Sequence, residues 1–169
     1  MKRFLHMFIF QSFLLTCLLQ GMNVYGQLES AVPFEEDVYK KTIKTVELRN
    51  PDFELSQPVL HLNASETLKL SFDELTVDLQ RYSYTFIHCN ADWTPSNLLS
   101  SEFIDGFAEN AIADYQYSAN TLQKYIHYST VFPNTSLRFT KSGNYLLKVY
   151  PEGNPDTPVL TRRFLVVDT

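Results

Sequence analysis

The chain has little glycine, little cysteine and no excess of basic residues. Its 169 residues include 5 Gly, which excludes collagen-like repeats and glycine-rich linkers. The 14 Lys and Arg residues are outnumbered by 19 Asp and Glu, and nucleic-acid binding is disfavoured because it needs clustered positive charge. Hydrophobic residues make up 44% of the chain, which is typical of a globular protein and too high for a disordered one.

The first apolar run of the chain is short. Lys2 and Arg3 precede an apolar stretch over residues 4–19, and the small residue Gly26 follows. A basic head, an apolar middle and a small residue at the end predict a secretory signal peptide over residues 1–26, cleaved after Gly26. An uncleaved anchor is the alternative, although the stretch is short for a membrane span.

Cleavage of the signal peptide would remove one of the two cysteines of the chain. Cys17 lies in the signal peptide, and its acylation is a further alternative, disfavoured because Thr16 is not one of the small residues that precede lipidated cysteines. The mature chain, residues 27–169, keeps Cys89 alone and can form no internal disulfide. Its twelve basic and nineteen acidic residues give a net charge of −7. The fold must therefore rest on a hydrophobic core, which a chain of this length can build.

Most of the chain after an acidic leader over residues 27–41 shows short strand-like patterns. Residues 67–72 are the clearest case, because apolar and polar residues alternate there as in a half-buried strand. The other predicted strands are residues 42–49, 59–62, 82–89, 111–118, 125–132, 145–150 and 159–167. One irregular helical turn is expected within residues 98–107.

Seven or eight strands separated by turn signals predict an all-β domain over residues 42–169, an antiparallel immunoglobulin-like β-sandwich without a disulfide. Tyr145 follows Gly143 by two residues where a strand begins, which is typical of the tyrosine corner of immunoglobulin-like domains. Leu147 stands where true immunoglobulin domains carry a cysteine. Large aromatic residues, 14% of the chain, are expected to fill most of the core.

The densest polar cluster, His-Cys-Asn-Ala-Asp-Trp over residues 88–93, does not favour a catalytic or metal site. His88 and Cys89 are neighbours in a predicted strand, so their side chains point to opposite faces. A zinc site needs about four converging ligands, and a catalytic Cys–His pair must be within hydrogen-bond distance. We therefore expect Cys89 to be a buried structural residue.

Other catalytic motifs are also missing from the sequence. There is no Gly-x-Ser-x-Gly elbow and no glycine-rich phosphate loop. Paired carboxylates such as Glu102 and Asp105 are expected on a solvated face, because nothing fixes their separation. The sequence therefore predicts no enzyme, no metal, no cofactor and no small-molecule substrate.

The long connection over residues 90–110 carries the candidate protein-contact residues. These are Asp92, Trp93, Phe103, Asp105 and Phe107. Exposed aromatic residues on loops often anchor protein interfaces, and Trp93 is the best candidate because it lies in a predicted loop beside Asp92. For most of the aromatic residues near this connection, Tyr115 and Tyr117 included, we expect burial in the core, and an exposed contact role is the alternative.

Six sequence blocks are specific when they are taken together. They are residues 84–93 (YTFIHCNADW), 101–107 (SEFIDGF), 114–118 with 120–121, 127–128, 132–134 and 142–150 (SGNYLLKVY). Because the blocks follow one another in this order, the chain resembles the N-terminal domain of the type IX secretion system plug protein family, and the resemblance extends over most of residues 40–168.

The resemblance implies an immunoglobulin-like β-sandwich in an exported periplasmic protein of Bacteroidota, associated with the outer membrane. Such plugs are understood to close the periplasmic mouth of the outer-membrane barrel that exports proteins. The implied partner is therefore that translocon barrel, and the implied mechanism is steric. Because family members are considerably longer, the chain is expected to be a fragment, a truncated product or an isolated first domain.

A carbohydrate-binding or accessory β-sandwich module of a surface glycan-utilisation system is the alternative function. The two functions predict different surfaces. A flat row of exposed Tyr and Trp rings would favour sugar binding, whereas buried aromatic residues with a charged rim would favour protein contact.

Overall fold

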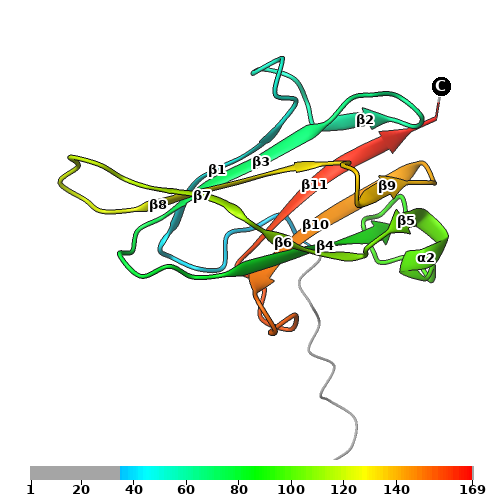
Figure 1. The fold of residues 1–169 in the computed structure, drawn as a ribbon. Coiled ribbons are helices and arrows are strands. Elements are labelled where there is room, and N and C mark those ends of the chain that lie inside the picture. The colour runs from blue at the N-terminus through cyan, green and yellow to red at the C-terminus, as the bar shows by residue number, and fades with distance from the viewer. Residues whose placement is uncertain (1–34, 169) are drawn as a thin grey trace, which may run out of the picture. The chain divides into compact units, whose positions relative to one another are not determined.

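A computed structural model describes residues 35–168, which form eleven β-strands and one helical turn. In chain order (Figure 1) the elements are β1 (Ile43–Arg49), β2 (Val59–His61), β3 (Leu68–Glu74), β4 (Tyr82–Cys89), α2 (Ser100–Phe103), β5 (Ile104–Gly106), β6 (Glu109–Ile112), β7 (Asp114–Tyr117), β8 (Ile126–Phe132), β9 (Leu137–Phe139), β10 (Gly143–Pro151) and β11 (Leu160–Val167). No helix in this part of the chain is long and apolar enough to cross a membrane. The predicted signal peptide and the start of the leader lie outside the described residues.

The strands form two larger sheets and one two-stranded ribbon. The first sheet has the order β1-β3-β8-β7, the second the order β2-β11-β10-β4-β6, and β5 pairs with β9. This arrangement confirms the predicted all-β class. The expectation of antiparallel pairing throughout is corrected at one place, because β2 runs parallel to β11.

Aromatic side chains of the two larger sheets meet in one core. Phe72 of β3 contacts Tyr82 of β4, with ring centroids 5.6 Å apart. Phe132 of β8 lies 4.8 Å from Phe86 of β4 and 5.4 Å from Phe164 of β11. All five rings are buried, and rings of this size bury enough apolar area to dominate the stability of a core. Within residues 35–168, more than half of the aromatic residues are buried in the core.

The strand count differs from the predicted seven or eight for two physical reasons. β5 and β9 have three residues each, which is too short for alternation to be visible. The stretch predicted as one strand over residues 111–118 divides between the sheets, because β6 pairs with β4 whereas β7 pairs with β8.

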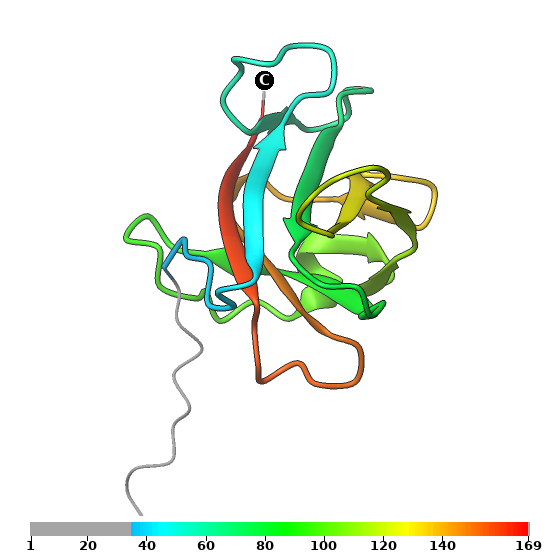
Figure 2. The same cartoon turned by 90° about the vertical axis from the view of Figure 1, so that its left-hand side faces the viewer.

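The end of the predicted leader, residues 35–41, lies along β11 (Figure 2). The Lys40 N–H donates to the Val159 carbonyl at 3.2 Å. The Lys40 ammonium contacts the carboxylate of the buried Glu74 and donates to the Tyr82 hydroxyl at 2.9 Å. The Tyr82 hydroxyl in turn donates to the Glu74 carboxylate at 2.9 Å. These contacts attach the segment before β1 to both larger sheets.

Candidate functional site

Loops that are far apart in the sequence gather at one end of the domain. This end, which we call the ribbon end, comprises residues 61–67, 90–107 and 133–142. The β5–β9 ribbon and α2 lie there, at the right of Figure 1, and β2 and the end of β11 reach toward the same side. The ribbon end includes all five residues that the sequence predicts as protein contacts.

A tight turn directly after β4 holds Trp93 and Asp92. Trp93 has a left-handed φ of +67°, and its N–H donates to the Asn90 carbonyl at 3.0 Å. The Arg163 guanidinium lies over the half-buried Trp93 ring, 4.5 Å from its centroid, in a cation–π contact. Asp92 is exposed and accepts from the Thr94 hydroxyl at 2.6 Å and the Thr94 N–H at 3.0 Å, and both bonds lower the pKa of its carboxyl. Both predicted contact residues are thus held in place at the surface.

The other three predicted contact residues differ in exposure. Phe103 is 3% exposed, and its ring centroid lies 5.7 Å from the ring of His88 and 5.7 Å from that of Tyr145. Phe103 is therefore a core residue, which corrects the expectation that it is a contact anchor. Asp105 is exposed in β5, and the Phe107 side chain is 69% exposed. Of this group, Asp105 and Phe107 remain available to a partner.

The start of β10 is built around a close approach to His88. Gly143 has a φ of +150°, and a Cβ there would lie 2.5 Å from His88 Nε2, so only glycine fits. Tyr145 is fully buried, its hydroxyl donates to the Lys141 carbonyl at 2.7 Å, and burial raises its pKa. His88 Nδ1 lies 2.9 Å from the Ser96 hydroxyl. These contacts order the start of β10 at the ribbon end.

Cys89 and the histidines do not converge on a metal site in the described part of the chain. Cys89 is 3% exposed, and burial raises the pKa of its thiol. Each described histidine has a hydrogen-bond partner: His61 with Glu66 at 2.8 Å, His88 with Ser96 at 2.9 Å, and His127 with Asp73 at 2.7 Å. Within residues 35–168, no group of three or more His, Cys, Asp or Glu side chains is placed to hold a metal ion.

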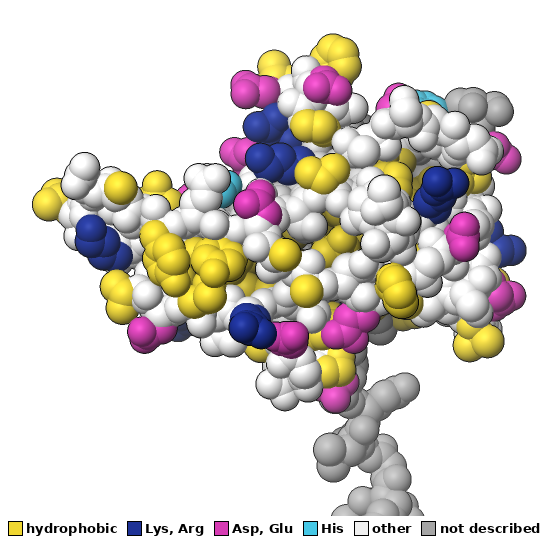
Figure 3. All heavy atoms as spheres, in the orientation of Figure 1, with side chains coloured by type: hydrophobic (Ala, Val, Ile, Leu, Met, Phe, Trp, Pro, Cys, Tyr) yellow, Lys and Arg dark blue, Asp and Glu magenta, His cyan; other side chains and the backbone are white. Residues whose placement is uncertain are grey.

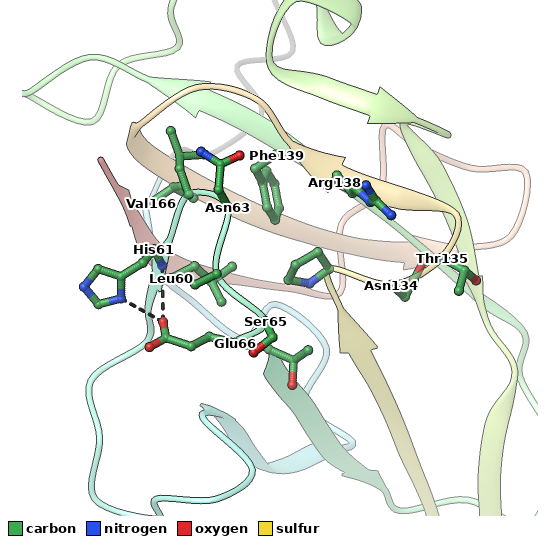
Figure 4. A pocket seen from close by; sticks show the side chains of 14 residues that line it. Leu60, His61, Asn63, Ser65, Glu66, Asn134, Thr135, Arg138, Phe139 and Val166 are labelled. Carbon is green, nitrogen blue, oxygen red and sulfur yellow. Dashed lines mark hydrogen bonds and ion pairs between the residues drawn. The ribbon is translucent and has the colours of Figure 1, made fainter. Parts of the chain in front are cut away.

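A cavity of about 550 Å³ opens at the ribbon end (Figure 4). Residues 61–67 form one wall and residues 133–139 the other. The core side chains Leu60 and Val166, each 2% exposed, line it together with the half-buried Phe139. The cavity therefore has an apolar floor and lies within the size range of small-ligand and side-chain pockets.

The charged groups of this cavity lie on opposite sides (Figure 4). On one side Glu66 accepts from the His61 ring at 2.8 Å and from the His61 N–H at 3.3 Å, and these bonds lower the pKa of Glu66. On the other side Arg138 of β9 makes no ion pair with any residue of the described chain. No local sequence signal predicts the cavity, because its two walls are loops that are far apart in the sequence and meet only in the folded chain.

A second exposed region lies at the far end of the domain, on the β7–β8 hairpin. Figure 3 shows hydrophobic side chains gathered over this hairpin, at the left. Tyr115 is 41% exposed and Tyr117 is 57% exposed, which contradicts their expected burial. They are exposed because β7 is an edge strand, whose side chains have a neighbouring strand on one side only. The two rings are nearly perpendicular, with an interplanar angle of 86°, and form no flat platform.

The chain is similar to a protein family and to a solved structure. The family described as type 9 secretion system plug protein 1st domain matches residues 43–168. A crystal structure of a hypothetical protein from Parabacteroides merdae ATCC 43184 is 38% identical, with a TM-score of 0.75, and the match covers 78% of this chain and 33% of that chain. The chain thus spans about a third of the length of that protein.

Two further solved structures are similar only at a low level. One is the Pseudomonas fluorescens alkylpurine DNA glycosylase AlkC bound to DNA, at 10% identity and a TM-score of 0.35, covering 74% of this chain and 30% of that chain. The other is a Niemann-Pick type C2 protein from Japanese carpenter ant, at 14% identity and a TM-score of 0.39, covering 80% and 96%. Neither likeness is strong enough to support an inference. None of the curated protein sequences matches this chain.

Proposed function

Because this chain belongs to the type 9 secretion system plug protein family, we propose that it is a non-catalytic interaction domain of the plug that closes the type 9 translocon. The match of the family's first domain to residues 43–168 is the observation that carries the proposal. It confirms the resemblance drawn from the six sequence blocks.

The domain that performs this role is an immunoglobulin-like β-sandwich in our proposal. Support comes from two sheets that share one aromatic core and from the hydrogen bond of Tyr145 to the Lys141 carbonyl. A disulfide is replaced by ring packing, since Cys89 is a free, buried cysteine.

The proposed location is the periplasm, at the inner side of the outer membrane. Export by the signal peptide predicted over residues 1–26 agrees with this address. The partner that we propose there is the translocon barrel protein of the type 9 system, because membership of a plug protein family supports association with that barrel. We infer that the plug blocks the periplasmic opening of the barrel by occupying it and catalyses no reaction.

The ribbon end is the surface that we propose for this contact. Phe107 is 69% exposed and Leu99 is 70% exposed, and the ribbon end also carries the exposed Asp92 and Asp105. Large apolar side chains with polar neighbours are typical of the centre and rim of a protein interface. The loops carrying them are tied to the core through Phe103 and Tyr145.

A binding measurement between the purified chain and the detergent-solubilised translocon barrel protein tests this function. We expect saturable binding that weakens at least tenfold in the double variant Leu99→Asp and Phe107→Asp, because a charge cannot be buried without a partner. Phe53→Asp is the matched control, since Phe53 is 68% exposed and lies outside the ribbon end. Absence of binding by the unaltered chain at both low and moderate salt would refute the proposal.

The carbohydrate-binding alternative has no supporting observation in the described residues. The exposed Tyr115 and Tyr117 rings are perpendicular to each other, and Trp93 is half-buried under Arg163. Sugar stacking requires flat, accessible rings, which these positions do not offer together. We therefore retain protein contact as the proposed function.

A further inference from the structure

We propose that the ribbon-end cavity is the anchor site for the translocon barrel protein, and that it receives an apolar side chain flanked by an Asp or Glu of that partner. The inference rests on the proposed function and adds to it the chemistry of the contact. The floor, the charges and the walls of the cavity support it.

The floor of the cavity determines that the inserted group is apolar. Leu60 and Val166 belong to the hydrophobic core, and Phe139 packs against it, yet all three line this opening. An apolar side chain placed there would cover the half-buried Phe139, since Leu60 and Val166 are each only 2% exposed already, and it stabilises the complex in proportion to the area covered. A cavity of about 550 Å³ is large enough for an aliphatic or aromatic residue and part of its backbone.

The charges of the cavity determine what accompanies this side chain. Glu66 is hydrogen-bonded to His61 at 2.8 Å, so its negative charge is already engaged. Arg138 lines the same cavity and has no ion-pair partner within residues 35–168. Because a guanidinium binds a carboxylate through two parallel hydrogen bonds, the complementary partner group is an Asp or Glu.

The walls of the cavity are ordered before any partner arrives. His61 and Glu66 close one loop upon itself through two hydrogen bonds. In the other loop the Asn134 N–H donates to the Leu137 carbonyl at 3.0 Å, and the Ser136 N–H donates to the Asn134 side chain at 2.9 Å. A preformed site loses little conformational entropy on binding, which favours its use as an anchor.

Two substitutions in the full chain separate the two parts of this site. Arg138→Glu reverses the charge, and Ala64→Trp fills the opening from an exposed position in residues 61–67. Lys124→Glu, at the exposed tip of the β7–β8 hairpin, is the matched charge control. We expect each cavity variant to weaken binding to the detergent-solubilised barrel protein at least tenfold, while the control changes it less than twofold. Arg138→Lys should retain part of the affinity, and the effect of Arg138 should shrink as salt increases.

The outcomes distinguish this inference from the proposed function. Binding by the unaltered chain with equal affinity for both cavity variants would overturn the inference and leave the plug function intact. A loss with Ala64→Trp but none with Arg138→Glu would overturn the acidic part of the site. Dimerisation of the chain alone that disappears in Ala64→Trp would identify a second copy as the occupant and also overturn it. Absence of binding by the unaltered chain would refute the proposed function, and with it the inference that rests on it. Equal unfolding midpoints for all variants establish that affinity alone has changed.

Discussion

At the scale of single residues, Gly143 fixes how β10 begins. Its φ is +150°, and a Cβ there would lie 2.5 Å from His88 Nε2, with two more ring atoms of His88 within 3.3 Å. We expect Gly143→Ala to lower the free energy of unfolding by about 3 kcal/mol, through backbone strain and overpacking together. Urea unfolding measures this loss.

Gly153 provides the control for this prediction. Its φ is +80°, but a Cβ there would meet nothing within 4 Å. Gly153→Ala should therefore cost about 1 kcal/mol, which is the backbone term alone. Equal losses at the two glycines would show that contact with His88 does not matter.

Cys89 is the second prediction at this scale. Its side chain is buried, and burial raises the pKa of its thiol, so little thiolate forms at neutral pH. We expect a thiol reagent to modify Cys89 only as fast as the domain opens, with a rate that increases when urea is added. Modification at the rate of a free cysteine in the absence of urea would contradict this placement.

At the scale of elements, the segment before β1 is attached through Lys40. Its ammonium contacts the carboxylate of Glu74, which is 2% exposed. Lys40→Met would remove the positive charge and leave the Glu74 carboxylate with Tyr82 as its hydrogen-bond donor. We expect the free energy of unfolding to fall by about 1–2 kcal/mol, and by no more than this because Lys40 is partly exposed. Urea unfolding of Lys40→Met is compared with that of Lys41→Met, the matched control at an exposed neighbouring position. A double variant with Glu74→Gln should recover part of the loss.

The elements themselves were predictable to different degrees. The alternation of residues 82–89 reproduces β4 without error, and the helical turn expected within residues 98–107 is α2 with its following strand. Alternation could not show that Ala113 separates two sheets, because the partner of a strand is decided by distant residues. The parallel pairing of β2 with β11 is undetectable from either strand alone for the same reason.

At the scale of the whole molecule, buried tyrosines on both sheets make stability depend on alkaline pH. Burial raises the pKa of Tyr128 to about 12, and it also raises the pKa of Tyr145 above its ordinary value of 10.0. A raised pKa in the folded state means that the stabilisation is complete below pH 10 and is lost as the pH rises toward 12. We expect the unfolding midpoint to fall over this interval, and to fall less steeply in Tyr128→Phe. A midpoint that is constant from pH 9 to pH 12 would contradict the burial of these hydroxyls.

The ribbon end shows where prediction from sequence stops. The sequence predicts Asp92, Trp93, Phe103, Asp105 and Phe107 as contact candidates, whereas in the structure Phe103 lies in the core because it packs on His88 and Tyr145. The cavity was missed because its floor and walls come from β2, β9 and β11 and from two loops that meet only in the folded chain. Composition indicates how many aromatic residues a core needs, but tertiary packing decides which of them remain exposed.

If this domain takes part in closing the translocon, it must lower the ion conductance of the purified barrel protein in a planar bilayer. Addition of the chain to the periplasmic side should reduce the conductance in a saturable way. The Leu99→Asp and Phe107→Asp double variant should require at least tenfold more protein for the same reduction. A conductance that is unchanged at concentrations where binding is saturated would show that the domain binds without closing the pore, and would contradict the account.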